Sequence, residues 1–296
     1  MKIPLSPPPI DELVRAATPE MLSRFPLLNL GPLANGQYLH WDELRHRSPP
    51  EGLDHKTWWL ALRMARSSNA QELPFQDKHG KPFSYSLPEP LLKSLHEIDR
   101  GAGLIPSGSD NAALRAEQGR YLMGSLIEEA ITSSQLEGAS TERRVAETML
   151  REGRKPRTLS ERMIFNNFEA MRRVRTLCDD KLEPAHIIEL QRVLTQDTLE
   201  YAEDCGRLRT RDDIEVVAPN DERLVLHRPP LAREIPERLQ KICGFANAPV
   251  SEGNFIHPVV RAILLHFMIG YDHPFGDGNG RTARTLFYWY MARQGY

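Results

Sequence analysis

Twelve consecutive residues of this 296-residue chain combine the side-chain types that phosphate chemistry needs. Residues 273–284 read HPFGDGNGRTAR, with one base, one carboxylate, three glycines and two arginines. Glycine permits positive φ and close approach of a ligand, and successive backbone amides in such a turn form a nest for an anion. The glycines are Gly276, Gly278 and Gly280. The stretch therefore predicts a phosphate-binding loop.

The charged residues of this loop favour a polyphosphate, a metal ion and a base. Arg281 and Arg284 are three residues apart, so in a helix they share a face and reach back over the loop. Asp277 would repel phosphate unless Mg²⁺ bridged the two, and a carboxylate with phosphate oxygens is a usual shell for that ion. The imidazole of His273, with a reference pKa of about 6.5, suits proton removal from a hydroxyl. The plainer alternative is a turn between two core helices with incidental surface arginines.

Two other phosphate motifs do not fit. The chain has no G-x-x-x-x-G-K-[ST] loop. Its glycine spacing is G-x-G-x-G after a helical pattern, whereas a dinucleotide fingerprint has G-x-G-x-x-G after a strand.

Two apolar helical patterns position the loop. Upstream, 258–270 is apolar on nearly all sides, which predicts a buried helix from Pro258 to a stop at Gly270. Downstream, 281–293 predicts a second, mostly buried helix. The loop is thus a helix–loop–helix junction with its amides at a helix N-terminus, which favours anions.

A second motif follows another helical pattern. Residues 132–138 read TSSQLEG, and Gly138 is typical of the position just after a helix. Glu137 would then lie in the last turn, where the helix dipole disfavours an anion. A residue that breaks a local preference is a candidate for function. The alternative is an exposed glutamate before a helix cap.

A β-hairpin is predicted between the two motifs. Residues 214–217 and 224–226 are short β-branched or apolar runs, and 219–221 (Pro-Asn-Asp) supplies the turn. A two-stranded ribbon can pair with an extended segment of a partner. A surface hairpin without function is the alternative.

Composition excludes several classes of protein. With 40% hydrophobic residues and a net charge of −2, the chain lacks the basic footprint of a nucleic-acid-binding protein. Three scattered cysteines make neither a zinc site nor a disulfide framework. No apolar run follows the N-terminus, and the longest apolar stretch, 259–271, is too short for a bilayer. We expect a cytoplasmic protein with no membrane partner and no nucleic acid bound through these residues.

The chain divides by proline content, because fourteen of its 23 prolines fall at or before Pro106. Residues 1–110 are therefore predicted to be a mixed, loop-rich N-terminal extension of unassigned role, with short helices at 41–47 and 57–66. Its tryptophans, Trp41, Trp58 and Trp59, suggest a small aromatic core, and 101–109 reads as a linker. Residues 111–296 are predicted to be mainly α, with helical periodicity at 114–131, 142–150, 159–177, 184–198 and 231–245, followed by the two helices around the loop.

Residues 273–284 resemble the signature of the Fic family, H-P-F-x-D-G-N-G-R-x-x-R, at every fixed position. The resemblance extends over roughly 111–296 and implies a Fic-type helical bundle with a small β-hairpin flap near 212–228. It also implies transfer of AMP from Mg-ATP to a Ser, Thr or Tyr hydroxyl of a target protein, which is another protein or the chain itself.

The resemblance assigns roles to the loop residues. His273 is the general base, and Asp277 holds Mg²⁺ between the α- and β-phosphates. Arg281 grips the outgoing phosphates and Arg284 reaches the γ-phosphate. The backbone around these side chains completes the nucleotide site: Gly276, Gly278, Asn279 and Gly280.

Ser133 and Glu137 resemble the inhibitory motif of the same family, [ST]-x-x-x-E-[GN], placed N-terminal to the signature. This implies an inhibitory helix near 121–138, in which Glu137 pairs with Arg284 and forces ATP into an unproductive pose.

Several alternatives stay open at this level. The same site serves AMP removal in some relatives and transfer of another phosphate-bearing group in others. A non-catalytic module that senses nucleotide is a different class of function. A homodimer, and a further module beyond residue 296 as in many relatives, are suggested by resemblance alone.

Overall fold

A computed structural model describes most of the chain. The described residues are 3–25, 31–102, 112–218, 221–249 and 255–296, of which 24, 112–122 and 222 are described by backbone alone. The chain forms two compact units, one of residues 1–105 with 218–222 and one of 106–217 with 223–296. The predicted linker and the predicted boundary after residue 110 fall largely on residues outside this description.

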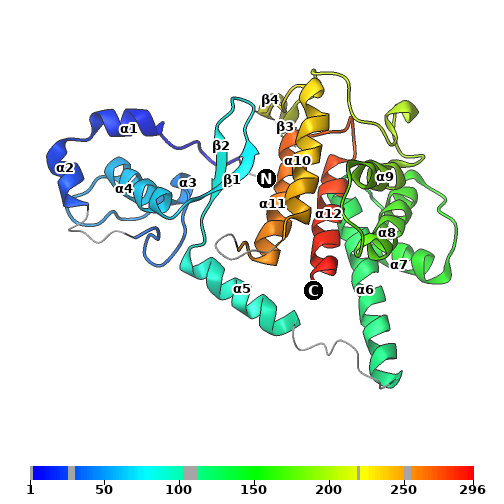
Figure 1. Ribbon diagram of the computed structural model, residues 1–296. Helices are drawn as coiled ribbons and strands as arrows, with labels where there is room; N and C mark the ends of the chain where they lie inside the picture. The colour runs from blue at the N-terminus through cyan, green and yellow to red at the C-terminus, as the bar shows by residue number, and fades with distance from the viewer. Residues whose placement is uncertain (1–2, 26–30, 103–111, 219–220, 250–254) are drawn as a thin grey trace. The chain divides into compact units, whose positions relative to one another are not determined.

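The N-terminal unit contains short helices and one two-stranded sheet (Figure 1). Its elements are α1 (Ile10–Ala16), α2 (Pro19–Arg24), α3 (Trp41–Leu44), α4 (His55–Ser68), β1 (Gln71–Gln76), β2 (Pro82–Tyr85) and α5 (Glu89–Ala102). The predicted helices at 41–47 and 57–66 correspond to α3 and α4. The predicted aromatic core is confirmed, since Trp41, Trp58 and Trp59 are at most 9% exposed and pack with leucines of α1 and α4.

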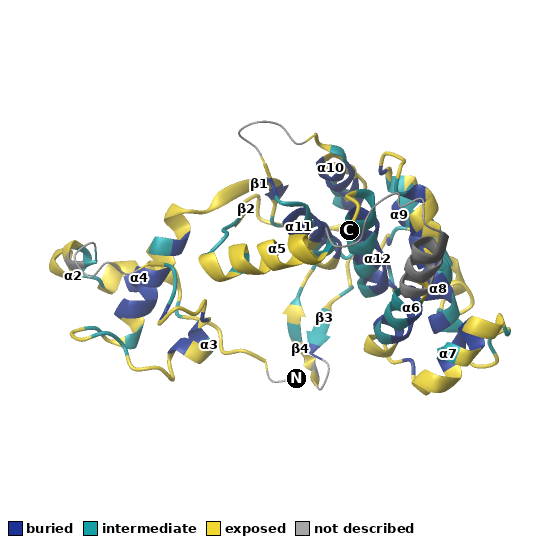
Figure 2. Cartoon of the chain, turned by 90° about the horizontal axis from the view of Figure 1, so that it is seen from below, coloured by how far each residue is buried: buried dark blue, intermediate teal, exposed yellow. Residues whose placement is uncertain are grey.

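The β1–β2 sheet and helices α1, α2 and α5 of this unit were not predicted, because the prolines indicated loops. β1 and β2 pair antiparallel, with Gln71 opposite Tyr85, and the register shifts between residues 72 and 76. Pro74 lies in that interval and has no amide hydrogen to donate, which accounts for the break in the ladder. Helix α5 begins just after Pro88. Figure 2 shows it exposed along most of its length, with Leu95 as its buried residue.

The C-terminal unit is a helical bundle, which confirms the predicted mainly-α fold. Its elements are α6 (Ala112–Leu136), α7 (Arg143–Glu152), α8 (Leu159–Leu177), α9 (Pro184–Thr195), η1 (Ala202–Asp204), β3 (Val216–Ala218), β4 (Asp221–His227), η2 (Ala232–Glu234), α10 (Ile235–Asn247), α11 (Pro258–Asp272) and α12 (Asn279–Arg293), except that the end of β3 and the start of β4 fall in the range 218–222 of the other unit. Helix α12 packs against α6, α8, α9 and α11. It is therefore the element that brings the loop before it to the centre of the unit.

Local signals set the ends of these helices. Thr158 caps α8 by accepting a hydrogen bond from the backbone of Glu161, and Pro258 occupies the first turn of α11. Inside the bundle, the indole of Trp289 is 1% exposed and donates to the carbonyl of Leu177 at 2.9 Å, which ties α12 to the end of α8.

The predicted hairpin is present, with shifted limits. β3 and β4 form a two-stranded sheet, but β3 begins at Val216 and β4 extends to His227. The predicted turn at 219–221 lies partly outside the described residues. None of the described helices is long and apolar enough to cross a membrane.

Candidate active site

The loop between α11 and α12 is held by its own side chains. Helix α11 continues two residues past the predicted stop at Gly270, and His273, at φ 46° and ψ 60°, ends it in the left-handed region. Pro274 then disfavours further helix at the residue before it. The Asn279 side chain accepts from the amide of Phe275 at 3.0 Å and donates to its carbonyl at 2.9 Å. These two bonds fold the loop into a closed turn.

Gly278 combines a positive φ with a position where a side chain does not fit. Its φ is 82°, a conformation that costs other residues about 1–2 kcal/mol. A Cβ there would lie 2.6 Å from Cγ2 of Thr195 on α9. The loop backbone therefore lies directly against α9, with its amides at the start of α12.

The imidazole of His273 has one nitrogen committed to the backbone. Nδ1 lies 3.3 Å from the carbonyl oxygen of Gly270, which can only accept, so Nδ1 carries the hydrogen and Nε2 keeps its lone pair. Burial lowers the pKa of His273 below its usual 6.5, and the charges of Arg209 and His227 lower it further. The hydrogen bond to Gly270 acts in the opposite direction. The ring is thus a neutral base at pH 7.

Arg209, which the sequence did not single out, fixes the backbone around His273. Its amide donates to the Pro274 carbonyl at 2.9 Å, and its Nε donates to the His273 carbonyl at 2.8 Å. Its Nη2 donates to the carbonyls of Pro230 and Asp272. Arg209 is 6% exposed, so these bonds hold α11, the loop and the segment after β4 together.

Asp272, next to the histidine, is a second buried charge that the sequence did not single out. It is 1% exposed, and its Oδ1 accepts from Nε of Arg238 at 2.7 Å. Burial raises the pKa of Asp272 to about 6, although Arg238 acts in the opposite direction. The end of α11 is therefore anchored on both sides of His273.

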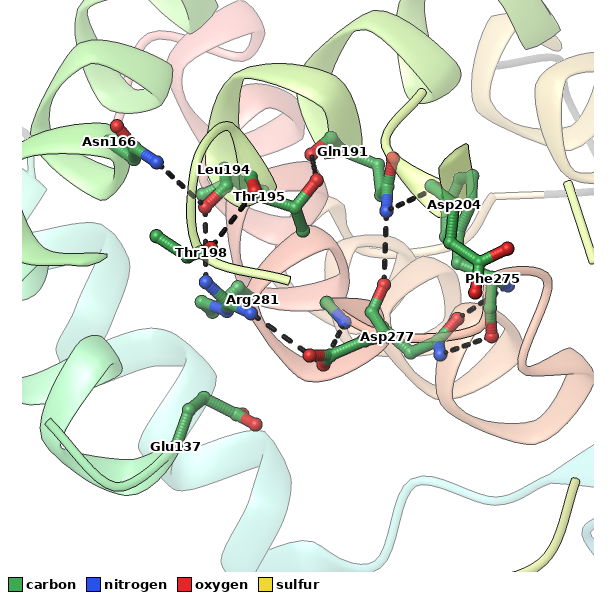
Figure 3. A network of polar contacts seen from close by, with 12 residues as sticks. Glu137, Asn166, Gln191, Leu194, Thr195, Thr198, Asp204, Phe275, Asp277 and Arg281 are labelled. Carbon is green, nitrogen blue, oxygen red and sulfur yellow. Dashed lines mark hydrogen bonds and ion pairs between the residues drawn. The ribbon is translucent and has the colours of Figure 1, made fainter. Parts of the chain in front are cut away.

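Asp277 and Arg281 face each other across the first turn of α12 (Figure 3). Nη2 of Arg281 lies 3.6 Å from Oδ1 of Asp277, and Nη1 donates to the Leu194 carbonyl at 3.0 Å. The Asp277 side chain is 59% exposed, whereas Arg281 is 2% exposed. The carboxylate therefore projects from the loop while the guanidinium lies beneath it.

Gln191 of α9 supports the loop through a hydrogen bond. No local sequence pattern indicated this role for Gln191. Its Nε2 donates to the carbonyl of Asp277 at 3.1 Å, and its Oε1 accepts from the amide of Gly206 at 2.6 Å. Gln191 is fully buried, and Figure 3 shows its contact with Asp277. It ties the loop to the segment that precedes the hairpin.

Ser133 and Glu137 lie beside Arg284, although they precede it by about 150 positions. Nη2 of Arg284 lies 2.6 Å from Oε1 of Glu137. Nε of Arg284 donates to Oγ of Ser133 at 2.6 Å, and Nη2 also donates to the Ser133 carbonyl at 3.1 Å. Helix α6 ends at Leu136, so Glu137 is the first residue after the helix rather than part of its last turn, and Gly138 follows with φ 94°.

The Glu137 carboxylate lies against the loop itself. A Cβ added at Gly280 would collide with Oε1 of Glu137. Gly280 is the second residue of α12, whose N-terminal amides and positive dipole end attract anions. Glu137 thus occupies, with its own negative charge, space that an anionic ligand of this helix terminus would use.

Asp277 could coordinate Mg²⁺ only together with oxygens from a bound phosphate compound. Among the described residues, no three acidic, histidine or cysteine side chains gather into a metal site. One exposed carboxylate beside a phosphate-type nest suits Mg²⁺, which commonly takes one or two carboxylates with phosphate oxygens and waters.

Comparison with known proteins places this arrangement in a family. Residues 181–291 match the model of the Fic/DOC family. The proteins named "Protein adenylyltransferase Fic" from Drosophila mojavensis and Nematostella vectensis are 37% and 34% identical over 70 residues, or 24% of this chain. The matched stretch spans only 14% and 16% of those relatives.

Solved structures agree on the fold. A Fic domain containing signaling protein from Bacteroides thetaiotaomicron is 23% identical, with a TM-score of 0.56 over 69% of this chain and 73% of that one. Fic-1 from C. elegans is 22% identical, with a TM-score of 0.52 over 69% of this chain and 56% of the Fic-1 chain. The family match on 181–291 includes the whole signature loop and α9 beneath it, so this part of the chain is a domain of the Fic/DOC family.

Proposed function

We propose that this chain is a protein adenylyltransferase, which transfers AMP from ATP to a hydroxyl of a target protein. The observation that carries the proposal is His273, a half-buried base with Nδ1 bonded to Gly270 and Nε2 unprotonated, at the entrance of the loop that leads into the N-terminus of α12. The names of the relatives from Drosophila mojavensis and Nematostella vectensis support AMP as the transferred group.

The proposed step uses the loop residues as follows. Nε2 of His273 takes the proton of the target hydroxyl, whose oxygen forms a bond to the α-phosphorus. The bond from that phosphorus to the bridging oxygen breaks, and pyrophosphate leaves. The amides at 278–280 bind phosphate oxygens, Arg281 neutralises the leaving pyrophosphate and Arg284 binds the γ-phosphate. When bound at Asp277, Mg²⁺ would add positive charge to the phosphates.

We propose that the β3–β4 hairpin is the flap to which an extended segment of the target binds. Nε2 of His227, the last residue of β4, lies 2.7 Å from the carbonyl of Tyr271. His273 follows Tyr271 by two residues. A target segment paired with β4 would therefore pass close to the catalytic base. The flap and the modified residue stay predictions.

We also propose that Glu137 holds the site inactive. Its carboxylate pairs with the arginine assigned to the γ-phosphate and lies over Gly280. An anion fixed there competes with phosphate for both the guanidinium and the helix terminus.

Labelled ATP tests the proposed reaction directly. Purified chain with Glu137→Gly is mixed with cell lysate and ATP labelled at either the α- or the γ-phosphate. Transfer of AMP puts α-label on protein and none of the γ-label. Protein carrying the γ-label would instead indicate kinase chemistry, and tight ATP binding with neither label on protein would favour a nucleotide sensor.

The pH dependence of AMP transfer should follow the protonation of the His273 imidazole. A general base acts when it is neutral, and the pKa of His273 is lowered, so the rate should decline on acidification with a midpoint below pH 6.5. Initial rates of the Glu137→Gly variant give the profile. Asp272 titrates near 6, so an Asp272→Asn variant, in which the decline should persist, separates the two groups. A decline centred above 6.5 would contradict the assignment.

A further inference from the structure

Two adjoining cavities lie in the N-terminal unit, where α4, the β1–β2 sheet and the start of α5 meet. Their volumes are about 250 and 600 Å³, and the larger is within the range of small-molecule sites. Four residues line both: Arg66, Tyr85, Ser86 and Pro88. Every lining residue belongs to this unit, so the cavities do not depend on the C-terminal unit.

Arg66 is a buried charge in the wall of both cavities. It is 6% exposed, and its Nε and Nη2 donate to the carbonyls of Pro32 and Leu39 at 2.9 and 3.0 Å. Its guanidinium carbon lies 3.8 Å from the centre of the Tyr38 ring. Within the described part of the chain, no carboxylate lies at ion-pair distance from it. The carbonyl bonds explain its position but leave its charge uncompensated.

Arg63 adds a second positive charge to the larger cavity. It is one helical turn before Arg66, so the two side chains share a face of α4. Arg63 is exposed, lines the larger cavity and disfavours the charge of Arg66. Among the described residues it too has no carboxylate within ion-pair distance. Like charges held together over one opening are typical of an anion site.

The rest of the wall supplies hydroxyl donors and an aromatic surface. Ser84 and Ser86 line the larger cavity together with Tyr38 and Tyr85. Ser67 and Ser94 also line it, but their hydroxyls donate to the backbone carbonyls of Arg63 and Pro90. The Tyr85 hydroxyl is fixed by donating to Oε1 of Gln71 at 2.6 Å. Tyr38 is 48% exposed, so part of its ring remains open to a ligand.

We propose that this cavity binds a phosphomonoester through Arg63 and Arg66. Two guanidinium groups without carboxylate partners match a group that carries nearly two negative charges at pH 7, and the hydroxyls of Ser84 and Ser86 can donate to its remaining oxygens. A carboxylate would neutralise only one of the two charges. The Tyr38 ring suits an aromatic or other flat group on the ester. All the residues of this site belong to the N-terminal unit, and the inference does not rest on the proposed transfer of AMP.

Calorimetric titration of the full chain with phenyl phosphate tests the site, with benzoate as the singly charged ring compound. We expect Arg63→Gln to weaken phenyl phosphate binding by about tenfold and benzoate to bind at least that much more weakly than phenyl phosphate. Arg63 is exposed, so its replacement leaves the fold intact. Lys93→Gln, an exposed lysine of the same unit outside the cavity, is the matched control and should change nothing.

Three results would overturn the proposal. One is the absence of phenyl phosphate binding at millimolar concentration. Another is equal binding of benzoate, which would indicate a carboxylate site. The third is unchanged binding by the Arg63→Gln variant, which would place the phenyl phosphate elsewhere, for example on the signature loop.

Discussion

Replacing Glu137 by glycine should raise AMP transfer from ATP to protein by about 10- to 100-fold, the effect of losing a partly buried ion pair of a few kcal/mol. The pair is short, 2.6 Å between Oε1 of Glu137 and Nη2 of Arg284, and its side chains are only 29% and 21% exposed. Its removal frees one donor of Arg284 and the space over Gly280 at once. Incorporation of α-labelled AMP into protein measures the change.

Arg284 should stay in place after this substitution. Nε of Arg284 donates to Oγ of Ser133, and Nη2 of Arg284 donates to the backbone carbonyl of Ser133. Neither hydrogen bond involves Glu137. The guanidinium is therefore still held over the start of α12 when the carboxylate is gone. This is why we expect gain of activity rather than loss of an ATP ligand.

Matched variants separate this effect from a general effect on α6. Glu137→Gln keeps the shape of the side chain and removes its charge, so it should activate in the same direction. Glu128→Gln removes a carboxylate of α6 that pairs with Arg143 and should leave the rate unchanged. If Glu137→Gly is folded but transfers no more AMP than the natural chain, the inhibitory role is wrong.

Removing His273 in the activated background should abolish transfer. Loss of a general base costs about 10²- to 10⁴-fold, so a His273→Ala, Glu137→Gly variant should show almost no labelled protein. ATP binding should persist, because the phosphates are assigned to the loop amides and arginines. Calorimetry with ATP and the label assay, run on the same preparation, measure the two properties separately.

The choice of substitution matters because His273 has φ 46°. Asparagine tolerates the left-handed region better than alanine, so His273→Asn should keep the loop geometry while lacking a base. The same loss in both variants, with unchanged ATP affinity, assigns the defect to the missing imidazole. Transfer that survives in the asparagine variant would exclude His273 as the base.

Much of the fold was predictable because it follows from local patterns. Apolar periodicity indicated α8 over its full length and both helices around the loop, since the buried face of a helix repeats along the chain. The β1–β2 sheet and α5 were missed in a proline-rich region. Their prolines lie at a register shift, at a strand start and in a first helical turn, where proline is tolerated.

The sequence by itself determined the chemistry of the loop: a base, a carboxylate and two arginines around glycines, all within residues 273–284. Such a motif is readable because neighbours in the chain are neighbours in space. Only the tertiary structure decided which distant groups complete it. Gln191 and Arg209 hold its backbone, and the packing of α6 against α12 brings Glu137 to Arg284. These contacts depend on how helices far apart in sequence pack together, and no local pattern specifies that.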